Sequence, residues 1–224
     1  MTETTANTAN QILDEALKLY SFGYTDRSGK VRWLAEELGI SVEEHKVEVG
    51  DNRKPEYKQI NPFGAIPTAI YRGETLTEST ATCIHLAEMF PEKGMAVFAK
   101  EKERYEYLRW ISMSAESMEG KLVDYILASY GIMPEELKGI FQQLLEFKCR
   151  AFAQQLPEEG FLVANRLTVA DIVTAYSLKL GILNGFIQYE QVEGYLGPLM
   201  QRKAAAKAHF FDGLKAFLEK SVSN

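Results

Sequence analysis

The sequence predicts an α/β domain of order βαβ-ββα followed by an all-helical domain. In the first 90 residues, short stretches of period-two alternation interleave with stretches whose apolar residues recur every three to four positions. Turn-forming residues at 91–94 (Pro-Glu-Lys-Gly) close this part, and helical spacing dominates beyond it. A chain of 224 residues with 46% hydrophobic content is long enough for two small domains.

The first three expected elements are a strand, a helix and a strand. Residues 17–22 alternate like a strand, and residues 45–49 alternate again. The helix between them ends at Gly39, a residue type typical of helix C-termini. Its apolar face consists of Val31, Leu34, Ala35 and Leu38. An irregular helix containing Pro55 follows the second strand.

A β-hairpin and a helix complete this domain. Residues 66–71 and 74–78 read as two short strands joined by the turn Arg72-Gly73. A helix begins at Ser79 and is closed by Pro91. Its apolar face consists of Cys83, Leu86, Ala87 and Phe90.

The hairpin and this helix bring two ligand-binding features together. Ser79 lies in the first helical turn, where unpaired N–H groups and the helix dipole favour an anion; simple capping of its own helix is the alternative. Pro67 has no N–H, so we expect it at a sheet edge, with the Ile66 N–H and C=O free for a peptide-like ligand. A cis Ile66-Pro67 bond would turn those groups into the cleft. The pair favours a short, acidic, extended peptide.

Two motifs resemble those of the glutathione S-transferase family. Asn61-Pro62-x-Gly64-x-Ile66-Pro67, followed by Leu76-Thr77-Glu78-Ser79, is similar to the family's glutathione-binding signature. Residues 166–172, Arg-Leu-Thr-Val-Ala-Asp-Ile, are similar to its C-terminal capping motif. The resemblance covers roughly residues 17–220 and implies a thioredoxin-like N-terminal domain.

The resemblance and the composition together suggest four segments. Residues 1–15, which are polar and lack a targeting pattern, are expected to form a flexible tail. A thioredoxin-like glutathione-binding domain is expected at 16–92, a linker at 93–100 and a helical domain at 101–224. Within the helical domain, Thr168 and Asp171 have capping-box spacing, which makes Asp171 structural rather than catalytic.

The resemblance implies glutathione as co-substrate, with its thiolate as the reactive species. The loop after the first strand would supply a donor that lowers the thiol pKa. Thr25 aligns with the hydroxyl of serine-type and related bacterial transferases, Arg27 with the cysteine of another class, and Ser21 with the catalytic tyrosine of a third. Thr25 is therefore the first candidate, Ser28 the second and Arg27 an electrostatic helper. The alternative for Ser28 is an N-cap.

Glutathione itself would be held by Ile66, Pro67, Glu78 and Ser79, as the resemblance implies. Many relatives carry Lys or Arg where this chain has Ala65, so another cation must meet the ligand's glycyl carboxylate. Arg53, Lys54 and Lys58 are candidates for that role, although a solvated run of charge is the alternative.

A helix expected within residues 101–127 carries two stripes. The seam predicted to be buried consists of Leu108, Ile111, Ala115, Met118 and Leu122. The second stripe consists of Tyr107, Trp110, Ser114 and Ser117. By the resemblance, Tyr107, Trp110 and Ser114 would line a pocket for a small hydrophobic electrophile; ordinary packing is the alternative.

Composition argues against several other classes of protein. The 25 basic residues face 31 acidic ones, which makes nucleic acid an unexpected partner. No run of 18 apolar residues suggests a membrane span. The cysteines Cys83 and Cys149 form no CxxC and the three histidines are scattered, so no metal is expected and a reducing cytoplasm fits best.

Three functional classes remain open at this stage. The first is a glutathione transferase that adds the thiolate to a small electrophile. The second is a glutathione-dependent disulfide or peroxide reductase that uses bound glutathione as its redox thiol. The third is a binding module of the same fold without turnover. A homodimer is expected from the resemblance and from the apolar residues between Leu86 and Met95.

Overall fold

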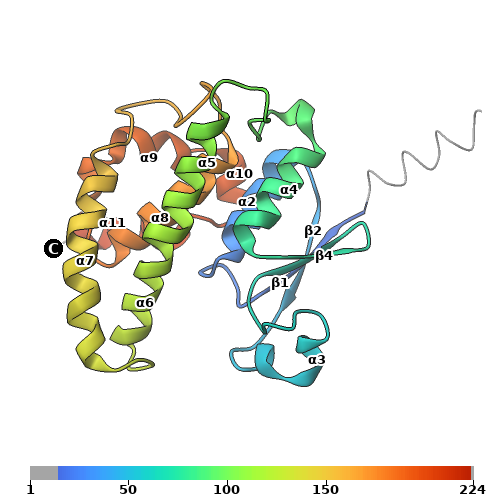
Figure 1. Ribbon diagram of the computed structural model, residues 1–224, viewed down its shortest axis with the longest axis horizontal. Helices are drawn as coiled ribbons and strands as arrows, with labels where there is room; N and C mark the ends of the chain where they lie inside the picture. Colours follow the sequence, from blue (N-terminus) through green and yellow to red (C-terminus); the bar gives the residue numbers. More distant parts are fainter. Residues whose placement is uncertain (1–14, 223–224) are drawn as a thin grey trace, which may run out of the picture. The chain divides into compact units, whose positions relative to one another are not determined.

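The computed structural model describes residues 15–222, so nearly all of the predicted tail at 1–15 lies outside the described residues. The chain divides into two compact units, shown in Figure 1. The first unit ends at Lys93 and also takes in Lys207–Phe210. The second consists of Gly94–Ala206 and the chain from Phe211 onward.

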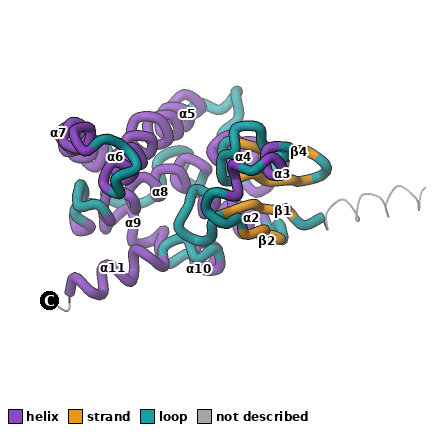
Figure 2. The backbone as a smooth tube through the Cα atoms, turned by 90° about the horizontal axis from the view of Figure 1, so that it is seen from below, coloured by secondary structure: helices purple, strands orange, loops and turns teal. Residues whose placement is uncertain are grey.

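The first unit is built on a four-stranded sheet of order β2-β1-β3-β4 (Figure 2). Its strands are β1 (Leu17–Ser21), β2 (Val42–Lys46), β3 (Thr68–Tyr71) and β4 (Glu74–Thr77). β1 runs parallel to β2 and antiparallel to β3, and β3 pairs antiparallel with β4. This topology confirms the predicted thioredoxin-like βαβ-ββα fold.

The unit's helices are α2 (Ser28–Leu38), α3 (Pro55–Lys58) and α4 (Ser79–Met89), with short 3₁₀ turns η1 (Asp51–Arg53) and η2 (Pro91–Lys93). α2 and α4 pack against each other. The core of the unit is formed by fully buried apolar side chains of β1, α2 and α4, among them Leu17, Leu19, Val31, Leu34 and Leu86.

The second strand was predicted three residues too late. It spans Val42–Lys46 instead of 45–49, in register with β1 from the pair of Leu17 and Val42 onward. β2 is an edge strand, and none of its five residues is buried. Without a buried face, side-chain alternation does not fix the register, so the pairing with β1 decides it.

Pro67 was wrongly placed at a sheet edge. β3 is an inner strand, flanked by β1 and β4. Pro67 is tolerated because ladder pairing begins one residue later, at Thr68, which faces both Tyr20 and Thr77. The Ile66-Pro67 peptide bond is cis.

All regular secondary structure in the described residues of the second unit is helical, which confirms the predicted all-helical domain. A continuous run comprises α5 (Arg104–Ser112), the π-helical segment η3 (Met113–Glu119) and α6 (Gly120–Ser129). It is followed by α7 (Glu135–Ala153), α8 (Val169–Leu183), η4 (Tyr189–Gln191), α9 (Glu193–Met200), α10 (Lys203–Lys207, whose last residue is grouped with the first unit) and α11 (Asp212–Val222). α8 is buried along nearly its whole length.

The buried seam predicted along α5 and η3 was partly wrong. Leu108 is 37% exposed, whereas Tyr107 and Ser114 are fully buried together with Ile111 and Met118. Leu108 and Tyr107 are neighbours in α5, ahead of the π-helical segment η3, and it is Tyr107 that faces the core there.

The apolar residues between Leu86 and Met95 do not form the exposed surface on which the dimer was argued. Leu86, Ala87 and Met95 are buried within the chain's own cores. A dimer therefore has to be argued from other surfaces.

Asp171 organises the start of α8. With Thr168 it forms a capping box, in which its carboxylate accepts the Thr168 N–H at 2.9 Å. The same carboxylate accepts the Leu162 N–H at 3.0 Å and the Tyr195 hydroxyl at 3.0 Å. Asp171 is fully buried, and burial raises the pKa of its carboxyl against the lowering effect of these hydrogen bonds.

We predict that Asp171→Ala lowers the free energy of unfolding by roughly 2–4 kcal/mol, because the cap is lost and buried donors are left unpaired. Glutathione affinity of the folded fraction should stay near that of the unmutated protein. Thermal and urea unfolding measure the change. Asp124→Ala, which removes a partly exposed ion pair with Lys121, is the control and should cost about 0–1 kcal/mol. Unchanged unfolding with lost turnover would contradict the structural role.

Candidate functional site

Three segments of the first unit begin or end at the same end of the inner strands β1 and β3. β1 ends at Ser21, close to Thr68, because Tyr20 pairs with Thr68. Thr68 also pairs with Thr77, so the residues before Thr68 and those after Thr77 are neighbours across the hairpin. The loop after β1, the cis-proline turn and the start of α4 therefore converge.

The cis-proline turn is held from behind by a cluster of polar side chains. The Tyr57 hydroxyl lies 2.9 Å from the Ala65 carbonyl oxygen and 2.8 Å from the Thr68 hydroxyl. The Asn61 side-chain amide donates to the same two groups, at 3.1 and 3.0 Å. Within the described part of the chain nothing hydrogen-bonds to the backbone of Ile66, which keeps its donor and acceptor for a ligand.

Gly64 allows the preceding segment to pack against this turn. Its φ is +61°, and a Cβ built on it would lie 2.6 Å from the Asn52 carbonyl oxygen. The Asn52 side chain donates to the Gly64 carbonyl at 2.6 Å. Only glycine accommodates both the left-handed backbone and this close approach.

The start of α4 presents an open helix N-terminus. Ser79 is its first residue and is 6% exposed, while Glu78 occupies the cap position without a capping side-chain bond. Glu78 has φ +61°, a strained value for a residue with a side chain. Such strain persists where surrounding structure enforces it and concentrates at functional sites.

The loop between β1 and α2 is fixed by Asp26. Its carboxylate accepts the backbone N–H groups of Phe22 and Ser28, each at 2.6 Å. Thr25 and Tyr24 are exposed on this loop. Arg27 occupies the cap position of α2, in helical conformation. The candidate hydroxyl of Thr25 therefore lies on the solvent side of a loop with a fixed shape.

Ser28 has the opposite environment. It is fully buried; its hydroxyl donates to the Gly23 carbonyl at 3.2 Å and accepts from Arg32 Nη2 at 2.9 Å. Arg32 also donates to Glu44 at 2.6 and 3.1 Å, and the Ser21 hydroxyl donates to Glu44. The Ser28 proton is thus engaged within the protein.

The candidate cations between β2 and β3 are all exposed: Arg53, Lys54 and Lys58. Lys54 forms an ion pair with Asp51 at 2.6 Å, and the hydrogen bond to Asp51 raises the pKa of Lys54. Lys58 lies beside the cis-proline turn, with its Cε 3.7 Å from a Cβ built on Gly64. The role of these three cations toward the glycyl carboxylate stays a prediction.

The proposed substrate-pocket residues lie in the core of the second unit. Tyr107 and Ser114 are fully buried and Trp110 is 4% exposed. The hydroxyls of Ser114 and Thr174 are 2.7 Å apart, and the ring of Trp110 meets Phe152 edge-on. The contacts of these three residues are those of ordinary core packing, which was the alternative to a substrate pocket.

Sequence reasoning missed the polar residues that support the site. Arg32 carried a signal, because it is a charged residue between the apolar Val31 and Trp33 of an expected helix. Glu44 and Tyr57 carried none, since their partners come from other elements of the fold.

The chain's thiols are not placed for chemistry. Cys83 and Cys149 are buried, and burial raises the pKa of Cys149 to about 12, so its thiolate is scarce near neutral pH. Among residues 15–222, no three His, Cys, Asp or Glu side chains form a metal-binding group, and no helix is long and apolar enough to cross a membrane.

Comparison with known proteins agrees with this geometry. Residues 15–88 match the family described as Glutathione S-transferase, N-terminal domain. The chain is 24% identical to glutathione S-transferase GstA of Escherichia coli O157:H7 over 185 residues, 80% of this chain and 87% of that protein. It is 23% identical to glutathione S-transferase AN1595 of Emericella nidulans over 172 residues, 75% of this chain and 64% of that protein.

Solved structures share the fold. The structure described as "Ure2p in Complex with Glutathione" aligns with a TM-score of 0.76 and 18% identity, over 87% of this chain and 98% of that chain. A thioredoxin-like unit with a cis-proline turn, followed by a helical unit, is the fold that this chain shares with these solved structures. Residues 15–88 therefore match a glutathione S-transferase N-terminal domain, in a chain whose sequence and fold are similar to those of glutathione S-transferases.

Proposed function

We propose that the protein binds glutathione where β1 and β4 end and β3 begins, and activates its thiol for attack on a small electrophile. The observation that carries this proposal is the pairing of Thr68 with Thr77, which sets the unpaired Ile66 backbone beside the open N-terminus of α4. A tripeptide with a free carboxylate at each end suits such a site. The glutathione in the solved Ure2p complex supports the choice of ligand.

The ligand's γ-glutamyl end is assigned to Glu78, Ser79 and the helix N-terminus. The Glu78 carboxylate suits the ligand's ammonium group, while the Ser79 hydroxyl and the first N–H groups of α4 suit its carboxylate. The cysteinyl part of glutathione would then pair with Ile66 ahead of Pro67.

Ser79→Ala should weaken glutathione binding by roughly tenfold, because a hydrogen bond to a charged group contributes about 1.5–3 kcal/mol. Titration calorimetry measures the affinity. The control is Thr75→Ala, which removes an exposed hydroxyl from β4. Equal affinity in the Ser79 variant and the unmutated protein would reduce Ser79 to a residue of the helix start alone.

Thr25 is the proposed donor to the thiolate. Its exposure on a fixed loop supports this assignment, as does its position ahead of α2, whose N-terminus also favours an anion. The buried Ser28 is the second candidate and Arg27 the third.

Thr25→Val keeps the side-chain shape and removes the hydroxyl, so the pKa of bound glutathione should rise toward that of the free thiol. Thiolate absorbance against pH measures it. Ser28→Ala serves as the matched comparison and should move the pKa less. A pKa that responds to Ser28→Ala, or only to Arg27→Ala, assigns the role to those residues instead. If the unmutated complex shows no lowered pKa, the chain is a binding module.

The reaction class is tested with one panel of assays. After calorimetry with glutathione, conjugation of an aryl halide is measured beside reduction of a glutathione mixed disulfide. Conjugation supports the transferase. Reduction without conjugation supports the reductase, in which bound glutathione is the redox thiol because both protein thiols are buried.

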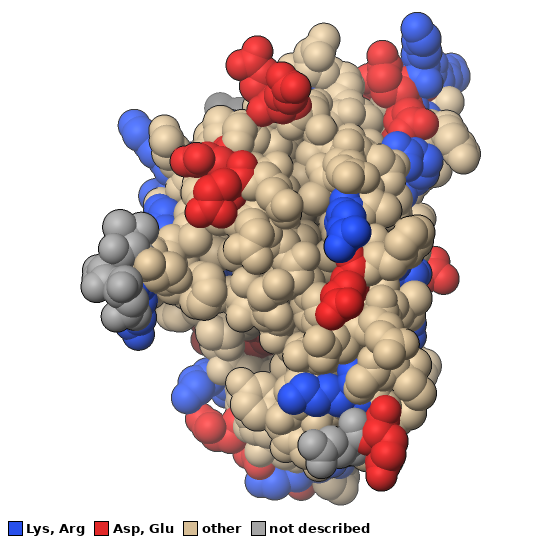
Figure 3. Space-filling model, turned by 90° about the vertical axis from the view of Figure 1, so that its left-hand side faces the viewer, with Lys and Arg blue, Asp and Glu red and all other residues tan. Residues whose placement is uncertain are grey.

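A homodimer is part of the proposal, formed by surfaces other than the residues between Leu86 and Met95. Phe63, beside the cis-proline turn, is 89% exposed. A cavity of about 190 Å³ lies between η3 and α7, lined by Met113, Ser117, Met118, Phe147, Lys148, Ala151, Phe152 and Gln155. Ile140, Leu144 and Phe147 are exposed apolar residues along α7. Figure 3 views the side on which α7 lies in Figure 1 and shows scattered charges of both signs around uncharged surface. The Phe63 ring of one copy would fill this cavity in its partner.

Phe63→Ser should convert the dimer to a monomer at micromolar concentration, because a fully exposed ring loses its apolar burial against the partner. Light scattering measures the mass. Val49→Ser is the matched control, since Val49 is 85% exposed and lies on another loop of the same unit. A monomeric unmutated protein, or a Phe63→Ser variant that stays dimeric, would contradict this interface.

A further inference from the structure

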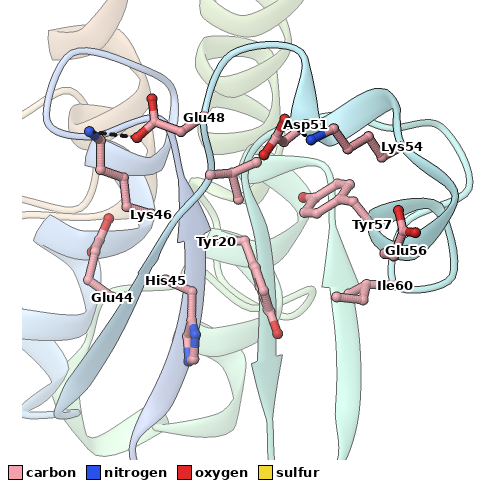
Figure 4. Close-up of a pocket in the computed structure, with 11 residues that line it drawn as sticks. Tyr20, Glu44, His45, Lys46, Glu48, Asp51, Lys54, Glu56, Tyr57 and Ile60 are labelled. Carbon is pink, nitrogen blue, oxygen red and sulfur yellow. Dashed lines mark ion pairs between the residues drawn. The ribbon is translucent and has the colours of Figure 1, made fainter.

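A cavity of the first unit lies outside the cis-proline turn and the start of α4, to which glutathione binding was assigned. It has a volume of about 800 Å³ and lies between the end of β2 and the segment that leads through η1 and α3. Figure 4 shows Tyr20 between His45 on one side and Tyr57 with Ile60 on the other. We call this cavity the Tyr20 groove. Its size is that of a site for a small organic molecule.

The inner surface of the groove is aromatic and held in place. The rings of Tyr20 and His45, which are paired across β1 and β2, stack with centroids 4.9 Å apart at 22°. Tyr57 meets Tyr20 nearly perpendicularly, with centroids 5.9 Å apart. The Tyr57 hydroxyl is fixed by Ala65 and Thr68, and burial raises the pKa of Tyr57, which keeps the phenol neutral.

The charged side chains around the groove leave a negative excess. Four carboxylates line it, from Glu44, Glu48, Asp51 and Glu56, against the ammonium groups of Lys46 and Lys54. Both lysines are already paired: Lys46 with Glu48 at 3.0 Å and Lys54 with Asp51 at 2.6 Å.

The remaining two carboxylates differ in their partners. Glu44 is bound by Arg32. Glu56 makes no ion pair with any residue that the structure describes. The groove therefore offers a carboxylate without an ion pair at its rim, beside the part of the Tyr20 ring that His45 and Tyr57 leave exposed.

We propose that the Tyr20 groove is a second ligand site, which binds a small organic cation that carries an aromatic ring. The ring packs on the Tyr20 and Tyr57 side of the groove, and the positive group faces Glu56. Aromatic anions are disfavoured by the same negative excess. This site shares only the candidate Lys54 with the proposed glutathione site and does not depend on that proposal.

Binding is measured with phenyltrimethylammonium as the cationic probe, benzyl alcohol as a neutral one and benzoate as an anionic one. Titrations followed by NMR are run on the full chain with and without saturating S-methylglutathione. We expect saturable binding of the cation in both conditions, with shifts centred on Tyr20 and Tyr57, and binding of benzoate weaker by about tenfold. Equal affinity for cation and anion would overturn the proposal. Loss of cation binding on addition of S-methylglutathione would place the probe in the glutathione site and also overturn it.

Variants separate the groove from nonspecific attraction by an acidic protein. Glu56→Lys reverses an exposed charge at the rim and should weaken binding of the cation by roughly fivefold or more, with an unchanged melting temperature. Glu92→Lys makes the same change at an exposed position outside the groove and should leave binding unaltered. Tyr20→Leu should reduce binding of both the cation and benzyl alcohol. Equal effects of Glu56→Lys and Glu92→Lys would show that net charge alone attracts the probe.

Discussion

The ion pair of Arg32 with Glu44 is the interaction on which the site's shape depends. It joins α2 to β2 behind the loop that carries the proposed donor, and Arg32 also donates to the Gly23 carbonyl and the Ser28 hydroxyl. Only 6% of the Arg32 side chain is exposed. Removing Glu44 would leave the buried Arg32 charge without its partner, but Glu44 is 30% exposed, so the cost lies below the roughly 3–5 kcal/mol of a fully buried pair. The loop is therefore constrained by the core of the unit rather than by its own residues alone.

The cis-proline turn is fixed independently, by Tyr57, Asn61 and Thr68. The side chains of Tyr57 and Asn61 hydrogen-bond to the Thr68 hydroxyl and the Ala65 carbonyl oxygen but leave the Ile66 backbone unpaired. The strained φ of Glu78 sets the start of α4 opposite this turn. Because the groups that would meet glutathione are ordered before it arrives, less conformational entropy is lost on binding. That is how a site made mostly of backbone can be selective.

The sequence carried enough information for the order of the elements and for the meeting of Pro67 with Ser79, because a short hairpin ties those two residues together. It did not determine the register of β2, an edge strand without a buried face, nor which of the neighbours Tyr107 and Leu108 in α5 faces the core, since both are large and apolar. The Arg32 network and the Tyr20 groove escaped prediction for a further reason. Their members come from separate elements, and only the fold brings them together.

The two hydroxyl residues Thr25 and Ser28, on the loop after β1 and at the start of α2, have different environments and different proposed roles. A thiolate near this loop would be repelled by Asp26, but that carboxylate accepts two backbone N–H groups, and the N-terminus of α2 favours an anion. Ser28 fixes the loop from inside, where its proton is already engaged. Thr25 is exposed on the same loop. The buried Ser28 hydroxyl is used to hold the loop, whereas the exposed Thr25 hydroxyl is accessible to a ligand. Thr25 is therefore the proposed catalyst, and Ser28 supports the loop that carries it.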